Sequence, residues 1–239
     1  MHRKPFHFKQ FSIHHDKCSM KVGTDGVLLG AWANVSTPKK VLDVGTGTGL
    51  IAIMMAQRGD LDTTIEAIEI EKDAYLQAIE NIENCPWHNQ ITVIHSSIQA
   101  FTNTSTSKYD LIISNPPFFL SGSKSENQKR NIARHTQTLS HEDLIYSTDQ
   151  LLSSGGKFSI ILPIDEGEIF IEKASQSNLF CSRITKVKPK VNKPFERMLM
   201  EFIRSITETK KTELIIQFEK RNDYTPAYIE LTQAFYTIM

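Results

Sequence analysis

Short apolar runs alternate with helical patterns along the chain from about residue 40. The apolar runs are rich in β-branched residues and end at polar or glycine-containing stretches, which is typical of buried strands. They occupy positions 41–44, 64–68, 91–95, 109–114 and 157–162. Between them, apolar residues recur at helical spacing in three segments, 50–58, 74–84 and 141–152. This alternation predicts an α/β fold, with a mostly parallel sheet and helices on both of its faces.

The later part of the chain predicts a different connection between strands. Two strand-like stretches, 184–190 and 198–205, are joined by a polar turn at 191–194 with no helix between them. Such a short connection pairs strands antiparallel, as a hairpin. A further strand at 213–218 and a closing helix at 226–236 follow. We therefore predict the class I methyltransferase (Rossmann-like) arrangement, a seven-stranded sheet with an antiparallel terminal hairpin.

Length and composition suit one globular domain. The chain has 239 residues, of which 40% are hydrophobic and 23% charged, and we predict a single domain over 1–239. It would comprise an N-terminal extension at 1–35, a catalytic core at 36–210 and a C-terminal strand and helix at 211–239. The sequence contains no long uninterrupted apolar run and no apolar leader, so we expect a cytoplasmic protein without a membrane segment. Three widely spaced cysteines suit reduced thiols.

Basic residues concentrate in two places, although the formal net charge is zero. One group lies within the first 21 residues and the other within 183–197. If the fold brings the two segments together, they form a positive face that can bind phosphates. The alternative is that these lysines only solvate an edge hairpin. Charge alone leaves both interpretations open.

A glycine-rich turn follows the first predicted strand and opens the first predicted helix. Glycines occupy alternate positions there, at Gly45, Gly47 and Gly49. Glycine lets the backbone turn tightly and approach a ligand closely. Dinucleotide-binding enzymes use a related turn, but their fingerprint leaves two residues before its third glycine. Asp43 lies two residues before Gly45, where a carboxylate can meet an amino-acid ammonium group directly or through water. The pattern favours S-adenosylmethionine as the cofactor.

The ends of the next two strands offer contacts to the rest of that cofactor. Glu69 follows the second strand, where an acid can accept hydrogen bonds from both ribose hydroxyls. Ile70 offers an apolar face to the adenine ring. After the third strand come Ser97 and Ile98, where many methyltransferases place an aspartate against the adenine amine. We predict that these four residues bind the adenosine part, with serine replacing the acid only in part.

The sequence Asn115-Pro116-Pro117-Phe118 directly follows the fourth predicted strand. Two consecutive prolines fix the backbone and remove two amide donors, which leaves a site rich in acceptors. If the Asn115 oxygen and the Pro116 carbonyl accept hydrogen bonds from an exocyclic amine, its lone pair is directed at the methyl donor. Phe118 can stack on an extruded base. These four residues are predicted to be catalytic, through positioning and without a side-chain base.

Other polar clusters carry weaker signals. His14, His15, Asp16 and Cys18 are close in sequence, but no partner pair with zinc-like spacing exists elsewhere, so we predict no metal site. A polar stretch after the catalytic motif suits a lid, an RNA contact or an ordinary exposed loop. Its candidate residues are Lys124, Lys129, Arg130, Arg134 and His135.

Further segments carry a resemblance to a known family. They are 8–11, 20–32, 133–135, 224–226 and 235–236. On these residues the chain resembles the bacterial methyltransferases that modify the exocyclic nitrogen of the adenine just 3′ of the anticodon in a valine tRNA. The resemblance spans nearly the whole chain, and the segment 20–32 is specific to this group.

The resemblance implies further site residues and a partner. Lys21, Thr24 and Asp25 would border the cofactor, and a helix at 27–32 would lead into the first strand. Asn115 to Phe118 carry over as the catalytic motif. The implied partner is the anticodon stem-loop of a valine tRNA, bound by a monomer, and an unpaired loop exposes bases that can be splayed out at little cost.

Several rival functions stay open. A glutamine-amide methyltransferase acting on a release factor uses the same proline motif, but it carries an N-terminal helical domain for which the residues before position 41 leave no room. A DNA adenine methyltransferase usually has a sizeable target-recognition domain, and we identify no such domain in this sequence. The glycine spacing disfavours a nicotinamide oxidoreductase. Intact Asp43 and Asn115 argue against an RNA-binding module without activity.

Overall fold

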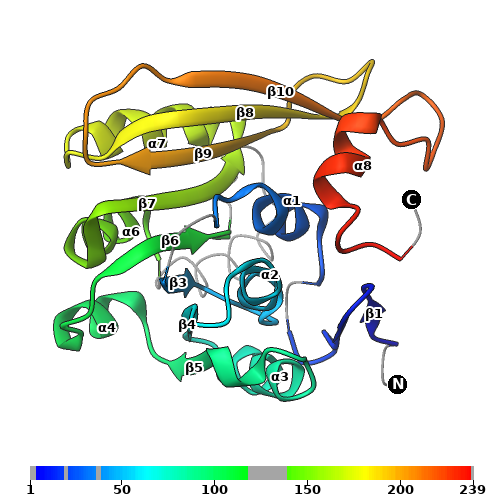
Figure 1. The fold of residues 1–239 in the computed structure, drawn as a ribbon. Helices are drawn as coiled ribbons and strands as arrows, with labels where there is room; N and C mark the ends of the chain where they lie inside the picture. Colours follow the sequence, from blue (N-terminus) through cyan, green and yellow to red (C-terminus); the bar gives the residue numbers. More distant parts are fainter. Residues whose placement is uncertain (1–3, 19–20, 36–38, 118–138, 238–239) are drawn as a thin grey trace, which may run out of the picture.

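The computed structural model describes residues 4–18, 21–35, 39–117 and 139–237. In these ranges, eight strands form one sheet in the order β10-β8-β9-β7-β6-β3-β4-β5 (Figure 1). The strands are β3 (Lys40–Val44), β4 (Thr64–Glu69), β5 (Ile91–His95), β6 (Tyr109–Ser114), β7 (Leu152–Pro163), β8 (Phe180–Lys190), β9 (Arg197–Ile203) and β10 (Lys210–Gln217). Strands β3 to β7 are parallel, and β9 is antiparallel to both β7 and β8.

Helices cover both faces of the sheet. One face carries α1 (Thr24–Trp32), α2 (Leu50–Arg58), α3 (Lys72–Glu83) and α8 (Pro226–Thr232), and the other carries α4 (Ile98–Thr104), α6 (His141–Leu151) and α7 (Ile164–Ser175). Alternate residues of β3 belong to the two cores: Val41 faces the first and Leu42 the second. A one-turn helix, η1 (His88–Gln90), precedes β5, and β1 (Phe6–His7) pairs with β2 (Ser12–Ile13) as a separate ribbon.

The predicted strands, the hairpin and the two covered faces are confirmed, but the prediction of seven strands is wrong. Strand β10 adds an eighth because it pairs in parallel with β8 along its whole length. Its first four residues are exposed, so they lack the apolar signal of a sheet strand. Helices α4 and α7 were not predicted, β7 begins at Leu152, and the closing helix ends at Thr232.

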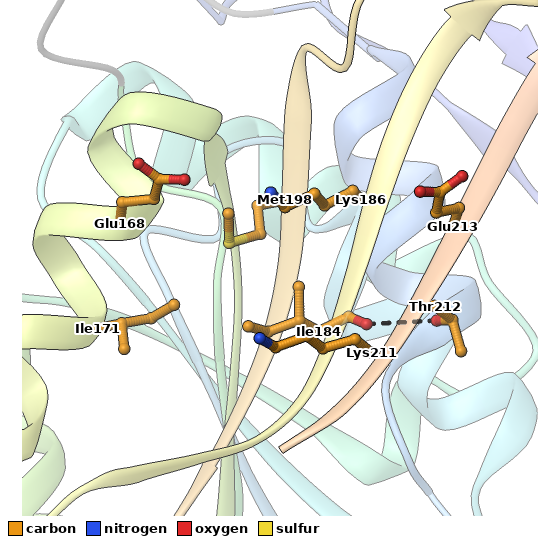
Figure 2. A pocket seen from close by; sticks show the side chains of 8 residues that line it. All are labelled: Glu168, Ile171, Ile184, Lys186, Met198, Lys211, Thr212 and Glu213. Atoms are coloured by element: carbon orange, nitrogen blue, oxygen red, sulfur yellow. Dashed lines mark hydrogen bonds between the residues drawn. The ribbon is translucent and has the colours of Figure 1, made fainter.

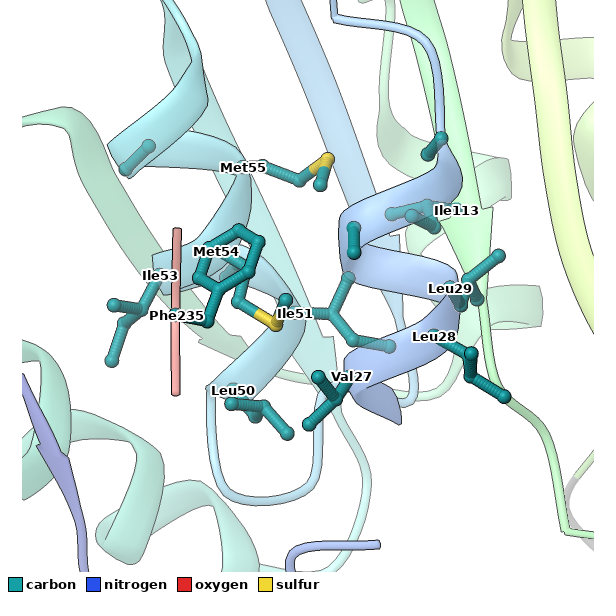
Figure 3. Close-up of a cluster of buried hydrophobic side chains, with 14 of the residues drawn as sticks. Val27, Leu28, Leu29, Leu50, Ile51, Ile53, Met54, Met55, Ile113 and Phe235 are labelled. Carbon is teal, nitrogen blue, oxygen red and sulfur yellow. The ribbon is translucent and has the colours of Figure 1, made fainter. Parts of the chain in front are cut away.

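Helices α1 and α2 pack closely against each other (Figure 3). Seven consecutive residues of α1, from Gly26 to Trp32, are buried, so this helix is apolar on nearly all sides. The approach is closest at Gly30, where an added Cβ would lie 2.6 Å from the Sδ atom of Met54. Glycine at this position therefore sets the distance between the two helices.

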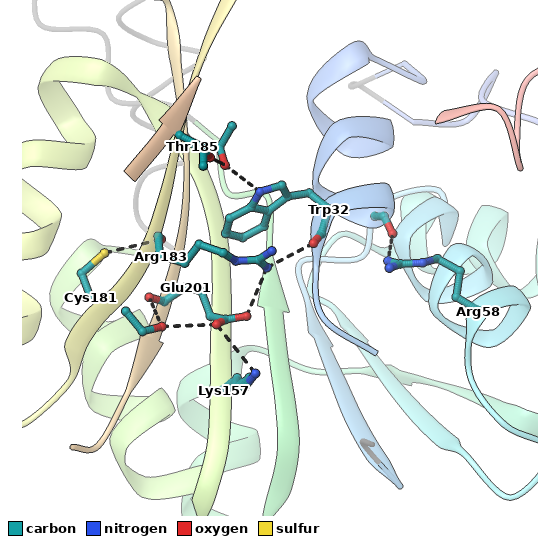
Figure 4. A network of polar contacts seen from close by, with 10 residues as sticks. Trp32, Arg58, Lys157, Cys181, Arg183, Thr185 and Glu201 are labelled. Carbon is teal, nitrogen blue, oxygen red and sulfur yellow. Dashed lines mark hydrogen bonds and ion pairs between the residues drawn. The ribbon is translucent and has the colours of Figure 1, made fainter. Parts of the chain in front are cut away.

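A polar network anchors the end of α1 to the hairpin strands (Figure 4). The Trp32 indole donates to Thr185 at 2.8 Å, and the Arg183 guanidinium lies 3.6 Å from the centroid of a Trp32 ring. Arg183 also donates to the Trp32 carbonyl and to the Glu201 carboxylate, both at 3.2 Å. Lys157 of β7 lies 3.8 Å from the same carboxylate. This network joins α1 to three strands of the sheet.

A buried carboxylate fixes the turn between β3 and α2. Asp43 has no exposed surface, and its Oδ2 accepts hydrogen bonds from the Thr46 hydroxyl at 2.5 Å and the Ala52 amide at 3.2 Å. Its Oδ1 is buried and accepts no hydrogen bond within the described ranges. Burial raises the pKa of Asp43 to about 7, against the opposing effect of the two hydrogen bonds.

Replacing Gly30 by alanine should destabilise the fold. The new methyl group would meet the buried Met54 side chain, and overpacking of this kind costs roughly 1–3 kcal/mol, less the gain of about 0.5–1 kcal/mol from helix propensity. We expect a lower free energy of unfolding in urea. The matched control is Gly155→Ala in β7, where an added Cβ meets nothing within 4 Å. Equal stability of the two variants would contradict the packing argument.

The raised pKa of Asp43 predicts a pH-dependent stability. Between its ordinary value of 3.8 and about 7, the folded state keeps a proton that the unfolded state has lost. Stability from this group is therefore lost as pH rises through that window, with a slope of up to about 1.4 kcal/mol per pH unit. Asp43→Asn should remove this slope. Urea titrations of the cofactor-free protein from pH 5 to 8 would measure it, and parallel curves for wild type and variant would refute it.

Candidate active site

The cofactor-type turn lies at the carboxyl edge of the sheet, directly after β3. Gly45, Gly47 and Gly49 have φ values of 71°, 58° and 80°, a region that residues with a Cβ rarely adopt. The amides of Gly45 and Thr46 both donate to the Ile68 carbonyl of β4, at 2.9 and 3.0 Å. A Cβ added to Gly45 or Gly47 would point into open space. The turn therefore presents bare backbone to a cavity.

That cavity has a volume of about 250 Å³. It lies between the glycine turn, the start of α1 and the end of β6. Its lining residues are Lys21, Val22, Gly23, Asp25, Gly26, Gly45, Thr46, Gly47, Thr48, Leu50, Ile51, Asn115, Pro116 and Pro117. The glycine turn and the proline motif, which are far apart in sequence, thus face one space.

The described part of the proline motif is held by neighbouring strands. Ser114, the last residue of β6, is buried and donates its hydroxyl to the Val44 carbonyl at 2.9 Å. Asn115 and Pro117 are half-buried and Pro116 is buried. The Asn115 amide lies 3.9 Å from the place that a Cβ on Gly26 would occupy. The start of α1 therefore lies in van der Waals range of the motif, and a side chain on Gly26 would be tight only against Leu50, at 3.2 Å. Phe118 lies outside the described residues.

Glu69 connects the glycine turn to the end of β4. One carboxylate oxygen accepts the Gly47 amide at 2.8 Å, and the other accepts the amides of Ile70 and Glu71, both at 2.9 Å. These three bonds point the acid toward the turn and away from bulk solvent, since Glu69 is buried. Its position at the strand end is the one the sequence suggested for a ribose contact.

The first turn of α1 connects the cavity to the hairpin. Lys21 and Asp25 line the cavity, whereas Thr24 lines two adjoining hollows. Asp25 accepts a hydrogen bond from the Nε of Arg197, in β9, at 2.9 Å. Because both groups are charged and partly buried, this contact locks α1 to the start of β9.

The remaining predicted residues lie outside the cavity lining. Gly49 is the N-cap of α2, and Asp43 lies inside the turn. Ser97 caps α4 by accepting the Ala100 amide at 3.1 Å, and Ile98 is buried beside it, while Ile70 is 37% exposed. The ends of β4 and β5, which carry these residues, are adjacent in the sheet.

Sequence reasoning missed several lining residues. The side-chain hydroxyls of Thr46 and Thr48 alternate with the glycines, and Val22 and Gly26 flank predicted residues of α1. The glycine motif itself could have indicated Thr46 and Thr48, because residues inside a tight turn line the same surface as its glycines. The polar residues 124–135 singled out from the sequence lie outside the described residues.

A second hollow, of about 460 Å³, lies between α7 and strands β8 to β10 (Figure 2). Its lining mixes Lys186 and Lys211 with Glu168 and Glu213, and it shares no residue with the glycine turn or the proline motif. The smaller cavity is the candidate active site, because the glycine turn and the proline motif converge there.

The described ranges contain neither a membrane-spanning helix nor a metal-binding cluster. No helix there combines the length and apolar character needed to cross a membrane. No group of three or more histidine, cysteine or acidic side chains gathers there as a metal site would require. Burial raises the pKa of both Cys18 and Cys181 to about 12, so these thiols stay protonated at neutral pH.

Comparisons with known proteins agree with this geometry. Residues 20–166 match the methyltransferase small domain family. A tRNA1(Val) (adenine(37)-N6)-methyltransferase of Trichodesmium erythraeum is 46% identical over 97% of both chains. One of the same name from Pseudoalteromonas translucida is 46% identical over 98% of this chain and 99% of its own.

The fold also has solved counterparts. A predicted O-methyltransferase from Agrobacterium tumefaciens has a TM-score of 0.69 at 20% identity, and the match covers 88% of this chain and 96% of that one. At this identity the likeness concerns the fold alone. Together with the domain match and the full-length relatives, it leads to one conclusion: the chain is a class I methyltransferase that belongs to the family of the tRNA1(Val) (adenine(37)-N6)-methyltransferases.

Proposed function

We propose that this protein transfers a methyl group from S-adenosylmethionine to the exocyclic amino nitrogen of adenine 37 in a valine tRNA. The observation that carries the proposal is the shared cavity, in which the glycine turn faces Asn115, Pro116 and Pro117. A cofactor turn and an acceptor-rich motif in one space suit methyl transfer to an amine. The full-length relatives bear the corresponding name.

The glycine turn fits S-adenosylmethionine. The open space at Gly45 and Gly47 admits a ligand against the backbone. Lys21 and the turn would hold the amino-acid part, together with the charge of Asp43, while Glu69 would meet the ribose. Ile70, Ser97 and Ile98 would border the adenine. When bound, the cofactor supplies an electrophilic methyl group on a sulfonium.

The chain's own residues would orient the amine. An exocyclic amine is a poor nucleophile because its lone pair is delocalised into the ring. The Asn115 side-chain oxygen and the Pro116 carbonyl would accept its two N–H groups and favour a pyramidal nitrogen. Pro116 and Pro117 have no amide hydrogens to compete as donors. Phe118 would stack on the extruded base.

We further propose that the protein acts as a monomer of one domain in the cytoplasm, where its tRNA substrate is found. Support for one domain comes from the single sheet that joins the described strands β3 to β10. Phe8 and Tyr236 also form a bridge, which ties the two terminal segments to one another. The anticodon stem-loop would approach the carboxyl edge, where the hairpin turn carries basic residues.

The reaction is tested with methyl-labelled S-adenosylmethionine and total tRNA from cells that lack this enzyme. Nucleoside analysis should find the label in N6-methyladenosine, confined to a valine tRNA. Label in protein or DNA, with none in tRNA, would retain the methyltransferase and overturn the RNA substrate. A glutamine-amide methyltransferase of release factors would label protein.

Asn115→Ala should lower kcat by about 10²–10³-fold, the usual loss when one positioned hydrogen-bonding group is removed. Cofactor affinity, measured by calorimetry, should stay near that of the wild type, because Asn115 acts on the acceptor amine. Asn103→Ala, at an exposed position on α4, is the matched control and should change neither. Equal losses of turnover and cofactor affinity would mean that Asn115 serves the cofactor instead.

A further inference from the structure

Two hollows follow the cofactor cavity in succession on the hairpin side. The first, of about 310 Å³, shares Gly23 and Asp25 with the cavity. The second, of about 370 Å³, shares Thr24, Pro189 and Ile216 with the first. Because neighbouring hollows share wall residues, they form one row from the catalytic motif to the C-terminal segment. We name this row the substrate groove.

The far end of the groove is aromatic. We name the second hollow the aromatic hollow. Its lining includes Phe6, Pro189, Ile216, Tyr224, Tyr228 and Tyr236. The rings of Tyr224 and Tyr228 stack with centroids 5.3 Å apart, and Phe6 meets Tyr236 edge-on at 6.1 Å. Tyr224 is half-buried, whereas Tyr228 is buried and shares a hydrogen bond with Tyr236. Tyr224 is therefore a ring with a fixed support and a surface open to a ligand.

The backbone around the hollow holds these rings in place. Tyr224 bridges Gln217 at the end of β10, and Tyr236 bridges Phe8. The Lys9 ammonium donates to the Gln233 carbonyl at 2.6 Å. Segments from both ends of the chain thus preorganise the hollow before any ligand enters, which lowers the entropic cost of binding.

The charge at the aromatic end of the groove suits a phosphate. Lys190 lines the aromatic hollow, and its ammonium donates to the neutral Glu219 carbonyl at 3.0 Å; within the described residues this ammonium forms no ion pair. The groove wall carries two acids: Asp25 is neutralised by Arg197, whereas Glu196 is exposed at the middle hollow, away from Lys190 in the lining of the aromatic hollow. A phosphate beside Lys190 therefore meets positive charge, next to rings on which a base can stack.

We propose that the aromatic hollow binds the base of an unpaired nucleotide that flanks the target adenine, stacked on Tyr224, with its phosphate at Lys190. The inference rests on the proposed function and extends it, since it assigns a second RNA subsite beside the catalytic one. Stacking of a base on an aromatic side chain, worth about 1–3 kcal/mol, corresponds to a 5- to 150-fold effect on affinity.

The test measures binding of a valine anticodon stem-loop to the full chain. Tyr224→Leu should raise the Kd for RNA at least fivefold and leave the Kd for S-adenosylmethionine unchanged. Tyr224→Phe keeps the ring and should bind RNA like the wild type. Lys190→Ala should lower the slope of log K against log salt by about 0.7, whereas Tyr224→Leu should leave that slope unchanged.

A set of modified RNAs makes the test independent of folding in the variants. The bases on the two sides of the target adenine are removed one at a time. One of these two removals should weaken binding to the wild-type protein. At that position Tyr224→Leu should cause no further loss, because protein and RNA changes remove the same contact. No loss at either flanking position, or fully additive losses, would overturn the subsite. Failure of the wild type to methylate valine tRNA would instead overturn the proposed function.

Discussion

The buried carboxylate of Asp43 is the constraint on which the active site depends. A charge without access to water is costly, and the cost falls when hydrogen-bond donors surround it. The turn after β3 brings the Thr46 hydroxyl and the Ala52 amide to that carboxylate. A chain can bend this tightly over so few residues only with glycine in left-handed conformations. The ligand-facing backbone thus follows from the way one oxygen of this acid, Oδ2, is hydrogen-bonded.

Helix α1 connects the cofactor side of the molecule to the substrate side. At its start, Asp25 is paired with Arg197 of β9, and at its end Trp32 is held by Thr185 and Arg183 of β8. Its middle packs on α2, which begins at the glycine turn. Since α1 is fixed at both ends to the hairpin, the cavity and the substrate groove keep one geometry relative to each other.

The parts that the sequence predicted are those fixed by neighbouring residues. The glycine turn and the proline motif are each a short, continuous segment, so the residue spacing within each segment was enough to predict its geometry. The apolar runs of the central strands are equally local. Strand β10 begins with exposed residues, and its partner could not be read from its own pattern. Helix α7 contains Gly167, which weakens a helical pattern but lets α7 approach Met198. The ion pair of Asp25 with Arg197 joins residues 172 positions apart and depends on the hairpin register.

The bridge between Phe8 and Tyr236 has a consequence for biosynthesis. The residues that line the cofactor cavity all lie between Lys21 and Pro117, so they leave the ribosome while most of the hairpin and the C-terminal segment are still unmade. The aromatic hollow needs rings from before position 10 and from beyond position 220. A growing chain therefore contains every described residue of the cofactor cavity well before it can close the aromatic hollow. The part of the groove built from both ends of the chain is the last to be completed in translation.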